Sequence, residues 1–504
     1  MPLAKALSIS LFGLAGRLIE IEADISSNLP AFVLVGLPDA SVNESASRVR
    51  AATTNSQLNL PGRRITVNLS PASVPKQGSG FDLGIAMAVL GAAGLVNKSK
   101  LTNTVFLGEL ALDGTIKPIT GVLAAVIAAR ALEIEHVVVP FSNLAEANLV
   151  SGVNVSGFSH LTQVAAVFGA SINPHPVAEE SVGECSIEQT ELCFSDVVGQ
   201  PDAIEALKVA AVGGHNVLMY GPPGAGKTML ASRLPGILPH LNEEEAIELC
   251  AIRSVAKMEV NRLSTTPPFQ APHHTASLVS MVGGGGSQPR PGLISLAHNG
   301  VLFLDEAPEF QSSVLESLRQ PLESGNITIS RAAGHAKFPA RFQLVLAANP
   351  CPCGHAVGSG KECTCSASAR LKYQNRISGP LSDRLDLRME LNAVNAALVN
   401  GESKGLTSKE IRVLVTKARK SSLDRLAKTS WRTNAQVPGS YLRRELRLGR
   451  SVTAQLDTAL DRNLISMRGY DRCLRVAWSI CDLGGRTSPT REDLATAVFL
   501  RGNE

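Results

Sequence analysis

The sequence predicts an α/β protein in three parts: an N-terminal α/β domain over residues 1–170, a second α/β unit over 194–395, and a helical C-terminal part over 396–504. Three observations support this fold class. In the first part, β-rich runs such as AFVLVGL and HVVVP alternate with Ala-rich helical stretches. A Gly-rich turn between an apolar strand and a helix opens the second part, and periodic apolar positions fill the last. The polar stretch 171–193 is predicted as a linker.

Composition indicates a folded chain without a membrane span. Of the 504 residues, 44% are hydrophobic and 18% charged, so the chain can bury several cores. The formal net charge of +4 creates no global basic field, and any nucleic-acid surface must be local. No apolar run approaches the ~18 to 20 residues that a bilayer span needs. The N-terminus leads into RLIEIEADI, whose alternation predicts a half-buried strand and not a cleaved signal peptide, so we expect a cytoplasmic location.

Local signals mark two helix starts in the C-terminal part. Thr407 followed three residues later by Glu410 fits a capping box, in which each side chain accepts from the backbone N–H of the other residue. Ser488 before Pro489 fits a second start, because proline is tolerated in the first helical turn.

The segment NVLMYGPPGAGKTML carries a phosphate-binding pattern. It has the form G-x-x-x-x-G-K-[ST] after a strand and before a helix, which is the context that the pattern requires. Its members are Gly221, Pro222, Pro223, Gly224, Ala225, Gly226, Lys227 and Thr228. Backbone N–H groups of such a loop surround phosphates, the lysine adds positive charge, and the threonine hydroxyl holds Mg²⁺. We therefore predict ATP and Mg²⁺ as ligands.

A second strand, in NGVLFLDEAPEF, ends in two acids. Asp305 at the tip of this strand is placed to hold Mg²⁺ through water. Glu306 is predicted to polarise the water that attacks the γ-phosphate.

The nine cysteines are too few for a disulfide scaffold, but four of them cluster. CPCGHAVGSGKECTC contains two C-x-C pairs separated by a Gly-rich loop, formed by Cys351, Cys353, Cys363 and Cys365. Four thiolates gathered by a flexible loop fit tetrahedral Zn²⁺, and His355 is an alternative to one sulfur. Disulfides or free thiols are the other interpretation, and a cytosolic setting disfavours disulfides.

Between the acidic strand end and the next strand, ITISRAAGHAKFPARFQL predicts a β-hairpin with a basic end. Arg331, His335 and Lys337 are candidate DNA contacts there. Aromatic residues are only 4% of the chain, so DNA would be bound through its backbone and not by sequence. The segment from Lys409 to Arg450 has twelve basic and three acidic residues, which fits either solvated helix faces or a phosphate-binding surface.

Five further segments stand in order along the chain: PFQAPHHTAS, PGLISLAHNGVLFLDEAPEF, LESLRQPLESG, LAANPCPCG and NRISGPLSDRLDL. With the phosphate-binding pattern and a helical C-terminus, they resemble the magnesium-chelatase-like AAA+ ATPases of the ComM/YifB group over nearly the whole chain. The resemblance implies an AAA+ core with a C-terminal α-helical lid. It also implies a homo-hexameric ATPase that moves along single-stranded, forked or branched DNA.

The same resemblance implies roles for three more side chains. Asn349, after the strand FQLVLAA, matches the polar sensor of the γ-phosphate. Arg384 in SDRLD matches the arginine finger that reaches the nucleotide of the neighbouring subunit. The sensor arginine of the lid matches Arg468 or Arg475, of which we favour Arg468.

The segment PKQGSGFDLGIA, residues 75–86, resembles the nucleophile turn of the Lon protease domain, which implies a Lon-protease-like N-terminal fold. In that alignment the serine position falls on Gly80, and Ser79 lies one residue early. The position of the general-base lysine falls on Ala125, and Lys76 belongs to the loop frame. Without a base a serine hydroxyl is a poor nucleophile, so we expect no proteolysis.

Three functions remain to be compared. The first is a DNA motor, specifically a branch-migration helicase acting on recombination intermediates during natural transformation or repair, as the ComM resemblance implies. The second is an ATP-driven protein unfoldase or protease-like machine, supported by the Lon-like domain. The third is a magnesium-chelatase-type ATPase subunit.

Overall fold

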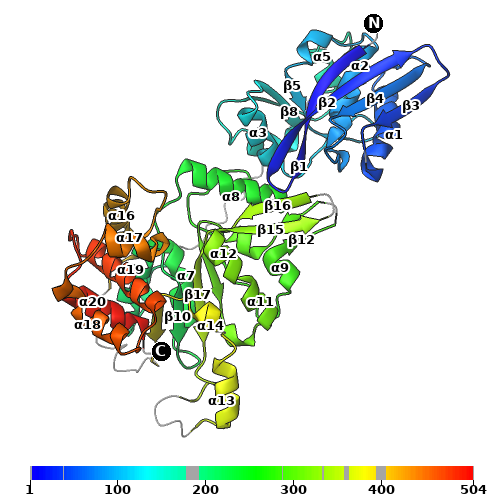
Figure 1. The fold of residues 1–504 in the computed structure, drawn as a ribbon. Helices are drawn as coiled ribbons and strands as arrows, with labels where there is room; N and C mark the ends of the chain where they lie inside the picture. The colour runs from blue at the N-terminus through cyan, green and yellow to red at the C-terminus, as the bar shows by residue number, and fades with distance from the viewer. Residues whose placement is uncertain are drawn as a thin grey trace.

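The computed structural model describes residues 3–37, 39–176, 192–286, 288–331, 334–356, 362–377, 379–392 and 405–502. Figure 1 shows an N-terminal α/β domain beside a larger unit in which an α/β core and the C-terminal helices pack together. The α/β class and the helical C-terminus are as the sequence predicts. Among the described residues, no helix is both long and apolar enough to cross a bilayer.

The N-terminal domain is built on a seven-stranded sheet of order β3-β4-β2-β1-β5-β8-β9. Its strands, with the small pair β6 and β7, are β1 (Leu3–Phe12), β2 (Ala15–Ser26), β3 (Ala31–Val35), β4 (Arg64–Ser70), β5 (Thr104–Phe106), β6 (Glu109–Leu110), β7 (Ile116–Lys117), β8 (His136–Pro140) and β9 (Asn154–Phe158). Its helices are α1 (Ala40–Asn55), α2 (Asp82–Ala92), α3 (Val122–Ala131), α4 (Leu144–Ala147) and α5 (Leu161–Val167).

The two faces of this sheet bury different helices. Along β1, Ala4 and Ala6 pack into a cluster with α1, α2 and α5, whereas Leu7 and Ile9 pack into a second cluster with α3. The alternation follows from the two-residue period of a strand. Every residue of α2 is buried, which explains its continuous apolar sequence.

The second unit contains a five-stranded parallel sheet of order β11-β14-β17-β10-β18. These strands are β11 (Phe269–Gln270), β14 (Val301–Leu304), β17 (Gln343–Ala348), β10 (Val217–Tyr220) and β18 (Leu387–Glu390). The strands β14 and β17 are buried along their whole length, as central parallel strands require. Two hairpins lie outside this sheet: β12 (Gly283–Gly284) with β13 (Arg290–Pro291), and β15 (Asn326–Arg331) with β16 (Gly334–Pro339).

The helices of this core are α6 (Pro201–Gly213), α7 (Lys227–Arg233), α8 (Glu243–Val255), α9 (Leu278–Val282), α10 (Leu293–Leu296), α11 (Ser312–Ser317), α12 (Arg319–Ser324), α13 (Ala367–Gln374) and α14 (Gly379–Ser382). The C-terminal helices are α16 (Ser408–Arg425), α17 (Gly439–Arg444), α18 (Arg450–Asp461), α19 (Met467–Leu483) and α20 (Arg491–Arg501). Helix α19 shares one hydrophobic cluster with α6, α16 and the central strands, so this helical part, the lid, is anchored on the core.

The two predicted helix starts have different outcomes. The capping box of Thr407 and Glu410 is present in both directions. The prediction at Ser488 and Pro489 is wrong by two residues, because α20 is capped by Thr490, whose hydroxyl and backbone N–H bond Asp493.

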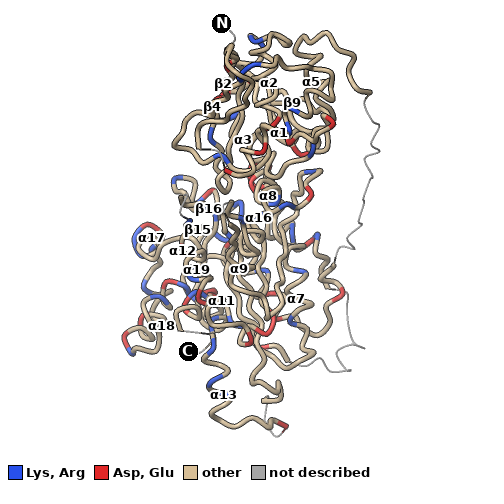
Figure 2. The backbone as a smooth tube through the Cα atoms, turned by 90° about the vertical axis from the view of Figure 1, so that its right-hand side faces the viewer, with Lys and Arg blue, Asp and Glu red and all other residues tan. Residues whose placement is uncertain are grey.

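Charges on the lid are mixed. Figure 2 shows acidic and basic residues close together around α17 and α18. Arg425 pairs with Asp482 at 2.6 Å and lies 4.2 Å from the centre of the Trp478 ring. Arg443 pairs with Asp471. Part of the basic segment therefore stabilises the lid and does not face a ligand.

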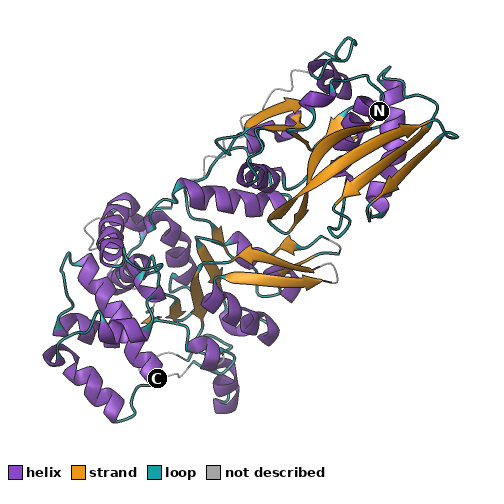
Figure 3. Ribbon diagram, turned by 45° about the horizontal axis from the view of Figure 1, so that its top comes forward, coloured by secondary structure: helices purple, strands orange, loops and turns teal. Residues whose placement is uncertain are grey.

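Several contacts join the N-terminal domain to the core, which lies beside it in Figure 3. Helix α3 and helix α8 share a hydrophobic cluster that includes Cys250 and Ala251. The turn between β1 and β2 lies on the hairpin β15–β16, where a Cβ on Gly13 would lie 3.0 Å from the Cβ of Ala336. Gly13 has φ +66°, so both its backbone and this close approach require glycine.

Candidate functional site

The phosphate-binding loop lies where the sequence predicts, between β10 and α7 at the carboxyl edge of the parallel sheet. Gly224 and Gly226 have φ of +78° and +85°, which only glycine adopts without strain. Asp305 and Asn349 follow β14 and β17, so three parallel strands bring their functional residues to one edge. Ligands of open parallel sheets bind at this edge.

Lys227 is held at the centre of this loop and is only 8% exposed. Its ammonium donates to the carbonyl oxygens of Gly221 at 2.7 Å and Pro222 at 2.9 Å, and to Asn349 Oδ1 at 3.0 Å. Burial lowers the pKa of Lys227, and the nearby carboxylates of Asp305 and Glu306 oppose this shift. A phosphate in the loop would offer this ammonium a charged acceptor in place of neutral carbonyl oxygens.

Thr228 and Asp305 form the part of the site suited to Mg²⁺. The Thr228 hydroxyl donates to Asp305 Oδ2 at 2.6 Å. Hydroxyl, carboxylate and phosphate oxygens are the donors that Mg²⁺ prefers, so these residues fit the ion.

Glu306 has an unusual backbone and one unexpected neighbour. Its φ is +50°, a conformation that costs a residue with a side chain about 1 to 3 kcal/mol and occurs preferentially at functional sites. Its carboxylate lies 3.6 Å from Nδ1 of His274, in the segment before α9. His274 lies about thirty residues before Glu306 in the sequence, so no local pattern predicts this contact.

The arginines predicted as the finger and the lid sensor lie at the opposite edge of the sheet from the P-loop. The Arg384 carbonyl accepts from Asn216 Nδ2 at 2.9 Å, immediately before β10 begins, whereas the P-loop follows the end of β10. The strand spans roughly 13 Å at 3.3 Å per residue, so Arg384 does not reach the P-loop of its own chain. Its guanidinium pairs with Glu323.

Arg468 lies beside Arg384, where it pairs with Asp383 at 3.2 Å and has a side chain that is 73% exposed. Arg475 donates from Nε to the carbonyl of Val437 at 2.7 Å. A role for Arg468 at a nucleotide therefore also requires a neighbouring subunit.

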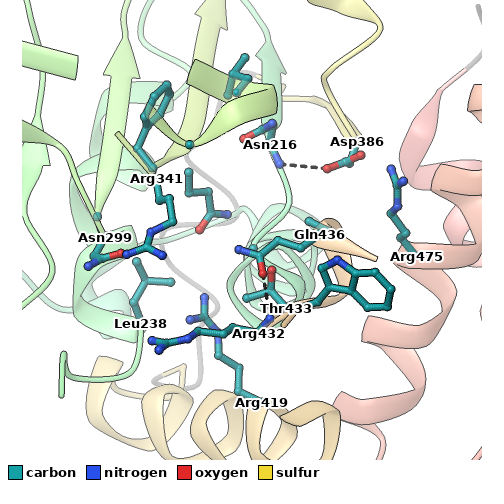
Figure 4. Close-up of a pocket in the computed structure, with 18 of the residues that line it drawn as sticks. Asn216, Leu238, Asn299, Arg341, Asp386, Arg419, Arg432, Thr433, Gln436 and Arg475 are labelled. Carbon is teal, nitrogen blue, oxygen red and sulfur yellow. Dashed lines mark hydrogen bonds between the residues drawn. The ribbon is translucent and has the colours of Figure 1, made fainter. Parts of the chain in front are cut away.

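These arginines line a cavity of about 1120 Å³ between the amino edge of the sheet and the lid. Figure 4 shows Arg341, Arg419, Arg432 and Arg475 around it, with Asn216 bonded to Asp386 at the strand starts. Residues 221–228, all described in the structure, do not line this cavity. The nucleotide loop and the arginine-lined cavity are thus separate sites on two edges of one sheet.

The four clustered cysteines come together. Their sulfur atoms all lie within 4.8 Å of one another. Cys351 Sγ is 3.3 Å from Cys353 Sγ and 3.6 Å from Cys363 Sγ. A tetrahedral zinc ion with Zn–S bonds of ~2.3 Å places its sulfurs ~3.8 Å apart, whereas a disulfide needs ~2.05 Å. The donor set and spacing fit zinc, while His355 faces Glu362 at 4.0 Å.

The predicted hairpin is present, but its basic residues do not share a face. His335 pairs with Ser330 and Lys337 with Thr328 on the exposed face. Arg331 has the same parity as the buried Ile329, and its Nε donates to the Gly285 carbonyl at 3.2 Å. The two-residue period of a strand already predicts that Arg331 lies on the opposite face from Ser330 and Thr328.

The Lon-like turn has a different set of partners. The Ser79 hydroxyl donates to the carboxylate of Glu109, and Lys76 donates to the Pro71 carbonyl. Ala125 is buried in α3. Among the hydrogen bonds of the described residues, none joins Ser79 to a lysine or histidine.

A parallel sheet with a P-loop after an inner strand, an acidic strand end, a polar strand end beside it and a helical lid defines an AAA+ P-loop ATPase. Family models for magnesium chelatase, subunit ChlI, match residues 193–399, for subunit ChlI of Mg-chelatase residues 21–143, and for the subunit ChlI C-terminal region residues 405–501. The chain therefore belongs to the magnesium chelatase subunit ChlI family, and within it to the ComM/YifB-type group.

Relatives of nearly full length support that placement. The chain is 47% identical to the uncharacterized protein Rv2897c of Mycobacterium tuberculosis, with 99% of each chain covered. It is 42% identical to competence protein ComM of Haemophilus influenzae over 99% of this chain and 98% of ComM. It is 39% identical to the uncharacterized protein YifB of Escherichia coli over 96% and 94%. A match of 147 residues, 31% identical, to Lon protease 2 of Bacillus subtilis covers 28% of this chain and 26% of that protein.

Family and site together make the chain an ATPase that uses ATP and Mg²⁺.

Proposed function

We propose that this ATPase is a homo-hexameric DNA motor, and that it drives branch migration of recombination intermediates during natural transformation or repair. The observation that carries the proposal is the near full-length similarity to a protein named for competence, combined with a complete nucleotide site. No base-reading surface is required, since a motor binds the DNA backbone and structure.

In the proposed reaction, the P-loop and Lys227 bind the phosphates of ATP. Thr228 and Asp305 would hold Mg²⁺, and the bound ion would supply positive charge beside the phosphates of ATP. Glu306 orients the attacking water, and Asn349 fixes the position of the γ-phosphate relative to Lys227.

The proposal of a hexameric ring is supported by the distance between Arg384 and the P-loop of the same chain. An arginine that stabilises charge on the transferred phosphoryl group contributes about 10³- to 10⁵-fold to the rate in related hydrolases. If the neighbouring subunit supplies Arg384, the nucleotide site is complete only in an assembly, and Arg468 joins it from the same edge.

DNA contact is proposed for the exposed face of the hairpin β15–β16. The hairpin lies in the chain between β14, which ends at the catalytic acids, and β17, which ends at Asn349. Residues 340–342 alone join the hairpin to β17, so movement at Asn349 could be transmitted along this strand to His335 and Lys337. Arg331 completes the candidate set from the other face.

The test measures ATP hydrolysis and dissociation of a synthetic four-way junction by the purified full chain. We expect ATP turnover to rise with forked or four-way DNA and junctions to dissociate, with Lys227→Ala as the inactive control. Turnover that ignores DNA, or that rises only with unfolded protein, contradicts the proposal.

A His335→Ala/Lys337→Ala variant tests the hairpin. We expect it to lose DNA stimulation and keep DNA-free turnover. Lys100→Ala, an exposed lysine of the N-terminal domain, is the matched control and should keep both. If DNA still stimulates ATP turnover normally in this variant, the DNA-binding site lies elsewhere.

We also propose that Cys351, Cys353, Cys363 and Cys365 bind one Zn²⁺ ion. Support comes from the donor set, the sulfur separations and the single loop that carries both pairs. The purified full chain should contain about one zinc per chain by metal analysis. A zinc-free chain with unchanged thermal stability contradicts this assignment.

A further inference from the structure

We propose that the cysteine site is a brace for the nucleotide site: the zinc-bound loop fixes the P-loop and Asn349 relative to each other, so that ATP turnover depends on a metal ion that takes no part in the chemistry. This inference rests on the zinc binding and the ATPase activity proposed above. Three contacts connect the cysteine loop to the catalytic residues.

The first contact is along the chain. Strand β17 ends at Ala348, Asn349 follows, and Cys351 comes two residues later. Cys351 is fully buried, so its sulfur is a fixed point close to Asn349. Asn349 in turn accepts from Lys227 at 3.0 Å. Displacing Cys351 would therefore displace the side chain that meets the P-loop lysine.

The second contact is through space, onto the P-loop itself. Gly354 closes the turn that begins at Cys351, with its N–H bonded to the Cys351 carbonyl at 3.0 Å. A Cβ on Gly354 would lie 2.6 Å from Cγ of Pro223, a P-loop residue. The backbone of the cysteine turn thus lies directly against the loop that binds phosphate, with room for glycine only.

The third contact comes from the helix after the second cysteine pair. Helix α13 begins after Cys365, with Ser366 as its N-cap. From its last turn, Gln374 donates to the carbonyl of Pro350, the residue after Asn349, at 3.3 Å.

The same segment also reaches the catalytic acids. Arg376 donates to the Pro308 carbonyl at 2.8 Å and lies 3.7 Å from the carboxylate of Glu309, three residues after Glu306. The two cysteine pairs and helix α13 thus belong to one segment that touches the P-loop, Asn349 and the turn after Glu306.

A metal ion is the element that gives this unit its rigidity. The segment between the two pairs has no strand or helix among its described residues, and four uncharged thiols contribute only weak hydrogen bonds. When zinc is bound by four thiolates, its binding free energy stabilises the folded arrangement of the residues that carry them. Small displacements matter here, because a misplacement of ~1 Å costs up to ~10²-fold in rate.

The experiment compares zinc content and ATP turnover in matched variants of the full chain. Zinc is released with a mercurial reagent and quantified with a colorimetric chelator, which reports the metal independently of activity. We expect Cys363→Ser to lose zinc and to lower kcat about 10- to 100-fold. Cys193→Ser, a partly exposed cysteine outside the cluster, should keep both zinc and kcat.

A second variant separates the contact from the metal. Gly354→Ala should keep one zinc per chain and still lower kcat, because its Cβ displaces Pro223 and the φ of +82° strains the turn against the P-loop. Circular dichroism of each variant shows that the chain remains folded. Zinc loss in Cys363→Ser with kcat and ADP affinity unchanged within two-fold overturns the brace and leaves the zinc site standing. A wild-type chain that never holds zinc overturns both, while the Lys227→Ala comparison still decides the ATPase.

Discussion

The chain contains two Gly-rich turns that precede a helix and carry a buried lysine, residues 75–82 and residues 221–228, and only the second has the surroundings of a working site. Lys76 is fully buried and donates to one carbonyl, that of Pro71. Lys227 is 8% exposed and has three acceptors, among them the side chain of Asn349. Burial lowers the pKa of both lysines.

The two turns differ in the functional residues that the ends of neighbouring strands place beside them. The P-loop lies at the carboxyl edge of a parallel sheet, where β14 and β17 end in Asp305, Glu306 and Asn349. The N-terminal turn is held mainly by its own domain: Ser10 Oγ donates to the Pro75 carbonyl at 2.9 Å, and the Gly78 N–H donates to Asp39 at 3.2 Å. Turn composition alone therefore does not determine chemistry, and the neighbouring strand ends do.

The largest expected effect comes from removing the lysine of the working turn. Lys227→Ala should lower kcat for ATP on the order of 10²- to 10³-fold, because a fixed charge at the transferred phosphoryl group is lost. Steady-state ATP hydrolysis by the purified full chain measures it. Turnover within two-fold of wild type would contradict the assignment of this loop.

The second prediction tests whether the site needs both edges of the sheet. Arg384→Ala should lower ATP turnover about 10³-fold, to a level similar to that of Lys227→Ala, yet a mixture of the two should regain activity. In randomly mixed rings roughly a quarter of the interfaces pair an intact P-loop with an intact arginine. ATP turnover of the mixture, compared with each variant alone, measures this effect.

Another arginine of the same cavity provides a control for the mixing experiment. Arg432 lines the same cavity and pairs with Glu245 at 2.7 Å, so Arg432→Ala should keep most of its turnover. A mixture that stays as inactive as its components would show that Arg384 does not act between subunits.

The parts of the site that the sequence predicted are those set by strand ends. In a parallel sheet, consecutive strand ends meet at one edge whatever the intervening loops do, so Lys227, Asp305 and Asn349 could be brought together from motifs alone. The α/β class and the helices of the lid could also be predicted, because hydrophobic periodicity is a local property of the sequence.

The remaining contacts are fixed by packing between distant elements. His274 beside Glu306, Glu323 beside Arg384 and Gly354 against Pro223 join segments whose relative position no local pattern encodes. The start of α20 was misplaced because Thr490 with Asp493 makes a stronger cap than the preceding serine and proline.

The third prediction concerns the buried lysine of the other turn. A folded-state pKa below the ordinary 10.5 means that the unfolded chain binds the proton more tightly. The stability of the N-terminal domain should therefore rise as pH increases through the lowered pKa toward 10.5, by at most about 1.4 kcal/mol per pH unit. Lys76→Met should lack this rise.

Hydrogen exchange of peptides from α2 measures this effect, with wild type and Lys76→Met compared at each pH so that intrinsic exchange rates cancel. The protection difference between the two proteins should change in favour of wild type as the pH rises toward 10.5. A constant difference would mean that Lys76 keeps its ordinary affinity for protons.

The smallest expected effect on ATP turnover comes from substituting Ser79, because this residue takes no part in the proposed reaction. The Ser79 hydroxyl donates to the Glu109 carboxylate, which holds the oxygen without removing its proton at neutral pH. Ser79→Ala should leave ATP turnover and junction dissociation within two-fold of wild type, with no peptide hydrolysis in either protein. The carbonyl of neighbouring Gln77 instead accepts from Gln288 of the β12–β13 hairpin at 3.4 Å. Peptide cleavage lost in Ser79→Ala would show that this turn retains the chemistry that its neighbours do not support.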